Sequence, residues 1–324
     1  MYSAEEIKTI IDRQLSELQL PEGFPGLYNP VNYILQLGGK RIRPFLTMMS
    51  ENLFNETIEN VAGPAMAMEV FHNFTLVHDD IMDEANLRRG AATVHHKWDL
   101  STAILSGDVM LIKAYELLAK CNVEVLPHLL NMFNNTAREV CEGQRLDMDF
   151  ETSEYITTDA YIEMIRLKTS VLLGCCCYIG AIAGGASKSD AEKLYAFGES
   201  LGISFQLQDD ILDTWGDAKV FGKQTGGDII RNKKTYLMLK TMETSEEEEH
   251  TYFMNLLSDA KLLPEQKVKD VTAFYEKKGV RLLAEKEMEK YYLYALQNLN
   301  DVQVEPSRKI VLETFAKEIF YRNY

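Results

Sequence analysis

Apolar residues recur along nearly the whole chain with the three- and four-residue spacing of helices. Alternating apolar and polar runs bounded by turn pairs, which are typical of strands, are hard to find. The pattern therefore predicts an all-α fold. The expected helices cover residues 3–19, 28–37, 42–54, 58–84, 99–120, 124–150, 158–185, 189–215, 229–242, 247–258, 264–278, 281–299 and 306–321.

Two segments bear on whether the chain enters a membrane. The longest apolar run, VLLGCCCYIGAIAGGA at 171–186, is shorter than the roughly 20 residues that cross a bilayer, and its glycines suit close helix packing. The N-terminal segment lacks the basic start and apolar block of a secretory signal, and it predicts an amphipathic helix. We expect no membrane span. Without a linker or repeat, one domain over residues 1–324 is the simplest description.

Charge and cysteine content narrow the classes of partner. The chain has 324 residues, and 49 acidic against 34 basic side chains give a net charge of −15. This charge argues against a nucleic-acid surface and against general attraction to anionic lipid. Three of the five cysteines are consecutive, which argues against a disulfide framework and favours a reducing, cytoplasmic location. Any anionic ligand must therefore meet a local cationic cluster.

Two acidic triplets share one spacing, DDIMD at 79–83 and DDILD at 209–213. Residues three and four apart are neighbours on a helix, so each triplet places its carboxylates on one face. One triplet alone could equally be a solvated helix face. Both follow strongly apolar turns, however, so six acids near a core need cations. Mg²⁺ fits because it binds one or two carboxylates and takes phosphate oxygens as further ligands. Zinc fits poorly, because no Cys or His residues have the spacing of zinc ligands.

Three basic clusters stand out against the net negative charge: GGKRIRP at 38–44, RRG at 88–90 and FGKQTGGDIIRNKKT at 221–235. Glycines in the first cluster let the backbone approach an anion closely, and the arginine pair can grip phosphate oxygens in bidentate fashion. The third resembles a phosphate loop only loosely, because the Walker spacing is absent. Each cluster alone could be a surface charge patch. Together they predict more than one phosphorylated ligand.

The order of these motifs resembles the trans-isoprenyl diphosphate synthases, or polyprenyl synthetases. The resemblance spans roughly residues 28–235 and rests on GGKRIRP, DDIMD with RRG, GQRLD, KT, FQLQDDILD and GKQTGGDI with NK. It implies a helical bundle around a deep central cavity, usually as a homodimer with one site per subunit. It also implies isopentenyl and allylic diphosphates as substrates and several Mg²⁺ ions per site as cofactors.

The resemblance further implies roles for individual residues. Asp79 and Asp83 match Mg²⁺ ligands, with Asp80 supporting them, and Asp209 matches the principal ligand of the second triplet, which Asp210 and Asp213 complete. Lys40, Arg43, His72 and Arg89 match an isopentenyl diphosphate site, and Arg88 matches a residue that holds the allylic diphosphate. Lys168, Gln206, Lys223 and Lys233 would surround the allylic group, with Thr169 beside the developing carbocation. Gln144 and Asp147 match supporting residues, whereas FYRNY supplies only Arg322 where the family has a basic tail.

A chemical expectation follows from these charges. Cationic groups stabilise the departing diphosphate, so that the allylic carbon–oxygen bond ionises. The double bond of isopentenyl diphosphate then attacks the carbocation, and a closed apolar cavity excludes water. We expect the two acidic helices to face each other across that cavity.

Product length depends on the helix before Asp79. At about 1.5 Å per residue, Phe74 lies about 7.5 Å and Phe71 about 12 Å below that aspartate. In the resembled family, an aromatic residue five positions before the first aspartate without a second at four is typical of geranylgeranyl diphosphate synthases. Phe74 followed by Thr75 has this pattern. Farnesyl diphosphate or a longer product remains the alternative, and both phenylalanines could be ordinary core residues.

Two further classes of protein are less consistent with the sequence. A class I terpene cyclase usually has a second metal motif of the Asn, Ser/Thr, Glu kind and lacks a site such as GGKRIRP for a second diphosphate. A non-catalytic partner subunit would typically have lost acidic ligands, and both triplets are intact here.

Overall fold

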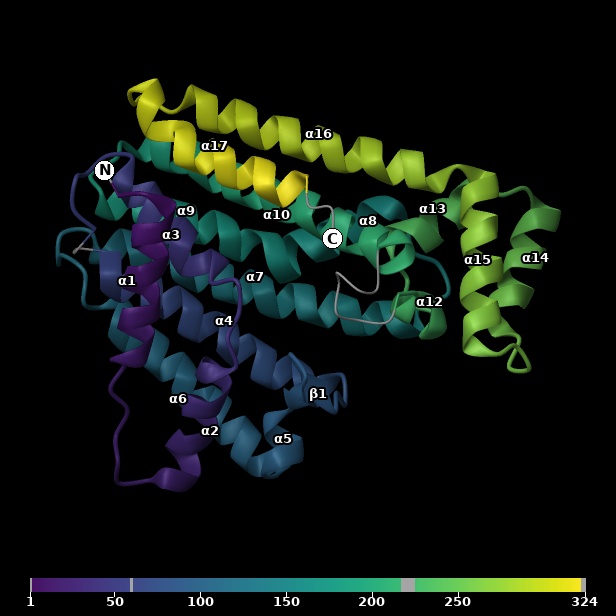
Figure 1. Cartoon of the computed structure of the whole chain (residues 1–324), viewed down its shortest axis with the longest axis horizontal. Coiled ribbons are helices and arrows are strands. Elements are labelled where there is room, and N and C mark those ends of the chain that lie inside the picture. The colour runs from purple at the N-terminus through teal and green to yellow at the C-terminus, as the bar shows by residue number, and fades with distance from the viewer. Residues whose placement is uncertain (1, 59–60, 217–224, 322–324) are drawn as a thin grey trace. The chain divides into compact units, whose positions relative to one another are not determined.

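The computed structural model describes residues 2–58, 61–216 and 225–321, and Figure 1 labels its elements. Helices make up nearly all regular structure in these ranges, which confirms the all-α prediction. The elements are α1 (Ala4–Ser16), α2 (Pro25–Gln36), α3 (Ile42–Asn52), α4 (Ala62–Met82), β1 (Leu87–Arg88), β2 (Ala91–Ala92), α5 (Val94–Lys97), α6 (Leu100–Leu118), α7 (Leu126–Thr152), α8 (Thr158–Ile165), η2 (Arg166–Ser170), α9 (Val171–Ala183), α10 (Lys188–Trp215), α12 (Gly227–Ile230), α13 (Tyr236–Thr244), α14 (Glu247–Ser258), α15 (Pro264–Lys278), α16 (Val280–Asp301) and α17 (Pro306–Phe320).

Local sequence rules fix several helix ends. Ser3 and Glu6 form a reciprocal capping box at the start of α1, which satisfies two backbone donors. Pro264 occupies the first turn of α15, where its missing N–H costs no hydrogen bond. Gly279 follows the last residue of α15 with a φ of 65°, a left-handed conformation that favours glycine.

The contacts divide the chain into two compact units. The first unit comprises Met1–Thr136, Leu172–Tyr195 and Leu299–Leu312, and the second comprises Ala137–Val171, Ala196–Asn298 and Glu313–Tyr324. The single-domain organisation stays a prediction. Each unit is described separately below.

In the first unit, α4 packs along α6 at close range (Figure 1). Glycines make this approach possible: a Cβ at Gly63 of α4 would lie 2.7 Å from the Leu117 carbonyl oxygen of α6. A Cβ at Gly107 of α6 would lie 2.1 Å from Nε2 of His78 on α4. A larger residue at Gly63 would press on the backbone of α6 and separate it from α4, whereas one at Gly107 would displace the His78 ring.

The apolar run at 171–186 behaves as predicted for its cysteines, since Cys175, Cys176 and Cys177 are fully buried in α9. One helical stretch, Thr158–Ala183, is long and apolar enough to cross a membrane by length and composition. In the structure 78% of its apolar window is buried, which a core helix would also show. The stretch is therefore weak evidence for a membrane span.

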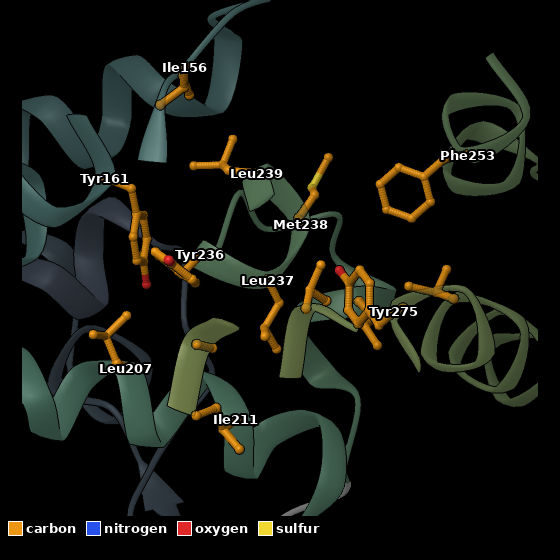
Figure 2. Close-up of a cluster of buried hydrophobic side chains, with 14 of the residues drawn as sticks. Ile156, Tyr161, Leu207, Ile211, Tyr236, Leu237, Met238, Leu239, Phe253 and Tyr275 are labelled. Carbon is orange, nitrogen blue, oxygen red and sulfur yellow. The ribbon is translucent and has the colours of Figure 1, made fainter. Parts of the chain in front are cut away.

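The second unit has its own hydrophobic core, drawn in Figure 2. Most of its side chains come from α8, α10, α13, α14 and α15, with others from α12 and α16, and the rings of Phe253 and Phe274 stack with centroids 5.2 Å apart. Leu207 and Ile211 contribute from the turns of α10 that flank Asp209. Core packing thus fixes the helix that carries the second acidic triplet.

Several local features of the described residues differ from the predicted elements, including the short helix α5, which no predicted helix covers. The helix predicted over 158–185 contains a π-helical turn, η2, in which the Val171 N–H donates to the Arg166 carbonyl five residues earlier. The helix predicted over 229–242 divides into α12 and α13, because Asn232 with a φ of 54° ends the first piece. A short antiparallel ribbon of β1 and β2, missed by the periodicity because each strand has two residues, follows the first triplet.

Glu51 yields a testable pH dependence. This carboxyl is fully buried on α3, and burial raises its pKa to about 8, an effect that the Val61 amide opposes. The folded state therefore holds an extra proton between pH 4.5 and about 8, so stability falls as the pH rises through that window. We expect Glu51→Gln to abolish this slope and to stabilise the fold above pH 8 by about 1–3 kcal/mol. Denaturant unfolding at several pH values would measure it.

Glu22→Gln is the matched control for that experiment, since Glu22 is exposed. An unfolding free energy that depends equally on pH in wild type and in Glu51→Gln would contradict the assignment.

Candidate active site

The first acidic triplet ends α4, and its three carboxylates occupy different environments. Asp80 is only 1% exposed and accepts hydrogen bonds from Nε and Nη2 of Arg88, the shorter at 2.6 Å. Burial raises the pKa of Asp80, while the Arg88 guanidinium lowers it. Asp79 is partly buried, and Asp83 is exposed as the C-cap residue of α4. The triplet therefore uses Asp80 to hold an arginine and presents two other carboxylates at the helix end.

The arginine pair lies on the ribbon rather than on a helix. Arg88 belongs to β1, and Arg89 occupies the turn with a φ of 53°. The hydroxyl of Tyr33 donates to the Ala92 carbonyl at 2.7 Å, and the buried Thr93 hydroxyl donates to the Ala85 carbonyl at 2.7 Å. These two bonds tie the end of the ribbon to α2 and to the residues just after α4, so both arginines have defined positions.

Four arginines gather around His72 in the first unit: Arg41, Arg43, Arg88 and Arg89, referred to below as the arginine cluster. Burial and the positive charges of this cluster keep the pKa of His72 well below its ordinary value. The imidazole is therefore neutral near pH 7, and the cationic charge comes from the arginines. Such a concentration of positive charge in a protein of net charge −15 indicates an anion site.

Members of the arginine cluster have different tasks. Arg41 is an ion-pair residue, 2.5 Å from the buried Glu69 carboxylate and bonded to the Leu35 carbonyl. Arg43 is buried enough to lower the pKa of its guanidinium, and its Nε has no hydrogen-bond partner in the described ranges. Arg43 thus carries a desolvated charge that an anionic ligand would complete.

The glycine pair at the start of the first basic cluster has an unusual backbone conformation. Gly38 and Gly39 have φ values of 77° and 145°, which side-chain-bearing residues rarely adopt. The Arg89 guanidinium donates to the Gly38 carbonyl, and a Cβ at Gly39 would lie 3.1 Å from that guanidinium. The two motifs GGKRIRP and RRG therefore meet, with Lys40 at the junction.

In the second unit, the carboxylates of the second triplet also differ in burial and in hydrogen-bond partners. Asp210 is 8% exposed and accepts hydrogen bonds from the Tyr161 hydroxyl at 2.7 Å and the Tyr236 backbone at 3.3 Å. Burial raises the pKa of Asp210 to about 7, although the hydrogen bond from the Tyr161 hydroxyl lowers it. Asp213 accepts from the Asp228 backbone at 3.0 Å, and Asp209, which precedes Asp210 on α10, is half-buried.

The KT motif, Lys168 and Thr169, lies in the π-helical turn η2. Lys168 forms an ion pair with Asp147 of α7 at 2.5 Å, so two predicted site residues from separate helices meet. Gly143 permits this approach, because a Cβ there would lie 2.2 Å from the Lys168 backbone nitrogen. Single π-turns inside α-helices often occur at functional sites, which fits the expected role of Thr169. Gln144 on α7 is buried.

The third basic cluster is described in part. Lys233 lies among Asp228, Asp147 and Asp210, whose charges raise its pKa although desolvation opposes them. The neighbouring Lys234 donates to the Phe150 carbonyl at 2.7 Å and so caps the end of α7. Gln206 on α10 is half-buried. Lys223 and Arg322 lie outside the described residues.

Several supporting residues were not predicted. Glu69 neutralises Arg41, Tyr161 holds Asp210, and Asp228 links Asp213 with Arg231 at 3.0 Å. The GGDI motif contains Asp228 and could have indicated it. Nothing in the local sequence distinguishes Tyr161 or Glu69 from ordinary helix residues, because their partners are distant in the chain.

The proposed product-length residues lie on α4 in the first unit. Phe71 is 1% exposed and packs edge-on against Phe133, with ring centroids 5.0 Å apart, and against Phe74 at 5.5 Å. The Thr75 hydroxyl donates to the His72 carbonyl at 2.8 Å, so it adds no bulk beyond its own turn. Phe74 is half-buried one turn above Phe71.

The oxygen donors at the acidic helix end fit Mg²⁺ in character. Within residues 2–58, 61–216 and 225–321, no three His, Cys, Asp or Glu side chains form a ready-made metal cage. Mg²⁺ is suited to such an open site, since it is usually held by one or two carboxylates together with water and substrate phosphate oxygens. In the first unit, Asp79 and Asp83 at the end of α4 are the carboxylates suited to this part, and in the second unit the candidate is Asp209 on α10.

Comparison with known proteins agrees with these features. Residues 25–276 match the polyprenyl synthetase family. A geranylgeranyl diphosphate synthase of Methanosarcina mazei is 41% identical over 75% of this chain and 76% of its own length. A geranylgeranyl pyrophosphate synthase of Geoglobus acetivorans is 35% identical over 94% and 93%. A solved structure of a geranylgeranyl pyrophosphate synthase superposes with a TM-score of 0.95 at 42% identity, covering 100% of both chains.

Proposed function

Since the chain belongs to the polyprenyl synthetase family and is a prenyltransferase, we propose that it is a Mg²⁺-dependent synthase of a short-chain prenyl diphosphate, with geranylgeranyl diphosphate as its main product. The substrates would be isopentenyl diphosphate and an allylic diphosphate. The observation that carries the proposal is the meeting of four arginines around a neutral His72, next to an acidic helix end. The arginines supply cations for isopentenyl diphosphate, and the carboxylates supply ligands for the Mg²⁺ of the allylic diphosphate.

The site residues divide between the two substrates. We assign Lys40, Arg43, His72 and Arg89 to isopentenyl diphosphate, because Arg43 carries a desolvated charge and Arg89 joins the two basic motifs. We assign Asp79, Asp83 and Asp209, with Arg88, to the allylic diphosphate. Asp80 orients Arg88 through its two hydrogen bonds. The remaining residues around the allylic group are Lys168, Gln206, Lys223 and Lys233.

The chain's own residues would act as follows. Bound Mg²⁺ supplies positive charge that stabilises the diphosphate as it leaves. Arg88, held in place by Asp80, neutralises further charge on the same group. The Lys168 carbonyl and the Thr169 hydroxyl stabilise the allylic carbocation from the π-turn. Lys40, Arg43 and Arg89 hold isopentenyl diphosphate so that its double bond reaches the carbocation, and the released diphosphate accepts the proton.

An assay with purified protein tests the proposal. Isopentenyl diphosphate would be incubated with each allylic diphosphate of five, ten or fifteen carbons, with and without Mg²⁺, and product chain length and diphosphate release would be measured. We expect Mg²⁺-dependent release and a twenty-carbon product. A fifteen-carbon or longer product would favour the farnesyl or longer-chain alternative, and no release from any pair would refute the proposal.

Product length should respond to the aromatic pair on α4. Phe71→Ala and Phe74→Ala each remove a ring from the aromatic cluster of Phe71, Phe74 and Phe133, so a longer tail can be accommodated. We expect at least one of them to lengthen the main product by one or more five-carbon units, as measured by chromatography of the dephosphorylated alcohols. Phe253→Ala, which removes a buried ring from the core of the second unit, is the control. Unchanged product length in both α4 variants would show that Phe71 and Phe74 do not limit the product.

We also propose that the protein acts as a cytoplasmic homodimer, with α6 in the subunit contact. Ile104, Leu105, Ile112 and Tyr115 project within an arc of about 100° on α6 and are exposed in the single chain. A surface of this kind is typical of subunit interfaces. We expect Leu105→Glu with Ile112→Glu to give a monomer by light scattering. Val123→Glu, at an exposed apolar residue outside α6, should remain dimeric.

A further inference from the structure

Tyr161 is a fully desolvated phenol whose hydroxyl donates to Asp210 in the described part of the chain, and the assigned site residues do not include it. Burial raises the pKa of Tyr161 far above its ordinary range, so its hydroxyl remains a donor at any physiological pH. Figure 2 shows the ring beside Tyr236, with its oxygen directed toward the helix that carries Leu207 and Ile211. That helix is α10, and Asp209 is the neighbour of the residue that Tyr161 holds.

A second contact joins the same two segments. Gly202 of α10 lies against Ser170, since a Cβ at Gly202 would be 2.8 Å from Cα, Cβ and Oγ of that serine. Tyr161 begins and Ser170 ends the stretch that includes Lys168 and Thr169. The later residue of one segment meets the earlier residue of the other, so the two segments run antiparallel. They are attached at both ends.

The two attached segments differ in length by one residue. Eight residues separate Gly202 from Asp210 on α10, or about 12 Å of regular helix, whereas nine separate Tyr161 from Ser170. A regular helix would place the ninth residue about 1.5 Å too far along and about 100° out of phase. The π-turn η2 absorbs the extra residue: its Val171 N–H reaches back five residues, and the Ser170 hydroxyl donates to the Ile165 carbonyl at 3.2 Å.

We propose that Tyr161 is a positioning residue for the prenyl transfer reaction: its hydrogen bond to Asp210 sets the register of α8 and η2 against α10. The bond thereby fixes Asp209, on the metal side, relative to Lys168 and Thr169, on the carbocation side. The inference rests on the proposed function and concerns one unit of the chain. Without the bond, α10 can shift against the π-turn, and the carboxylate of Asp209 loses its defined place.

Tyr161→Phe tests this role by removing one oxygen atom. Tyr275→Phe is the matched control, because Tyr275 is a buried tyrosine of the same hydrophobic core (Figure 2), and the described hydrogen bonds to Asp210 come from Tyr161 and the Tyr236 backbone. We expect Tyr161→Phe to raise the Mg²⁺ concentration for half-maximal rate about tenfold, as loss of a residue that orients a metal ligand commonly does. The KM for isopentenyl diphosphate should stay unchanged.

A binding readout separates positioning from general stability. Thermal unfolding with Mg²⁺ and inorganic pyrophosphate should show a smaller ligand-induced rise in Tm for Tyr161→Phe than for Tyr275→Phe or wild type. Equal Mg²⁺ dependence and equal thermal shifts in the two variants would overturn the inference. A wild-type protein that responds to Mg²⁺ and pyrophosphate but makes no prenyl product would refute the proposed function while leaving the positioning role measurable.

Gly202→Ala tests the same register from the other attachment. Its Cβ would press on Ser170 and displace η2 from α10. The Mg²⁺ concentration for half-maximal rate should therefore rise, as in Tyr161→Phe. This variant also carries the test if Tyr161→Phe does not fold. A folded Gly202→Ala protein with wild-type Mg²⁺ dependence would overturn the inference.

Discussion

Replacing Asp79 with asparagine is expected to lower kcat/KM about a thousandfold. The asparagine keeps the size of the side chain and removes the negative charge that we assign to holding Mg²⁺ on the allylic diphosphate. Metal-assisted stabilisation of a leaving group contributes several kcal/mol, and about 4 kcal/mol corresponds to a thousandfold change in rate. Steady-state rates with geranyl or farnesyl diphosphate over a range of Mg²⁺ concentrations would measure it.

Glu84→Gln is the control for Asp79→Asn. Glu84 is an exposed carboxylate five residues later, just beyond α4, and has a φ of 48°. Neutralising it should change kcat/KM less than threefold, because a solvated charge contributes little. A fall of similar size in both variants would mean that the net charge of the helix end matters, rather than a metal ligand at Asp79.

Replacing Arg43 with methionine is expected to raise the KM for isopentenyl diphosphate about 10- to 100-fold while the fold becomes no less stable. A hydrogen bond to a charged group contributes about 1.5–3 kcal/mol, which gives the change in KM. The stability expectation follows from burial, which lowers the pKa of the Arg43 guanidinium although the nearby Glu69 charge raises it, and Nε has no hydrogen-bond partner in the described ranges. Replacing a buried charge whose desolvation outweighs its compensation with an apolar side chain removes a cost.

Arg41→Met should give the opposite result. Arg41 is 2.5 Å from Glu69, and its loss leaves that carboxylate buried without its cation. Breaking a buried pair in this way destabilises a protein by about 3–5 kcal/mol. Denaturant unfolding together with KM measurements would separate the two arginines, which are two residues apart in GGKRIRP. Loss of stability in Arg43→Met with unchanged KM would contradict the assigned ligand role.

The aspartate triplets illustrate how far the sequence reached. Their spacing predicted carboxylates on one helix face, and α4 and α10 do carry them. The same spacing does not distinguish Asp79 from Asp80. In the structure Asp79 is partly buried, whereas Asp80 is fully buried and accepts a hydrogen bond from Arg88. Neighbouring residues on a helix point about 100° apart, so their environments depend on elements elsewhere in the chain. The facing of the two triplets stays a prediction.

The sequence by itself determined the helical fold, the main helices and the set of charged motifs, because these depend on residue spacing, glycine and proline positions and side-chain chemistry within a few turns. Tertiary structure decided the π-turn at Lys168, the ribbon that carries Arg88, and the partners Glu69 and Tyr161. Each of these depends on a contact between residues 8 to 49 positions apart or on matching the lengths of two packed helices. Local sequence contains no record of such distances, which are set when the helices pack.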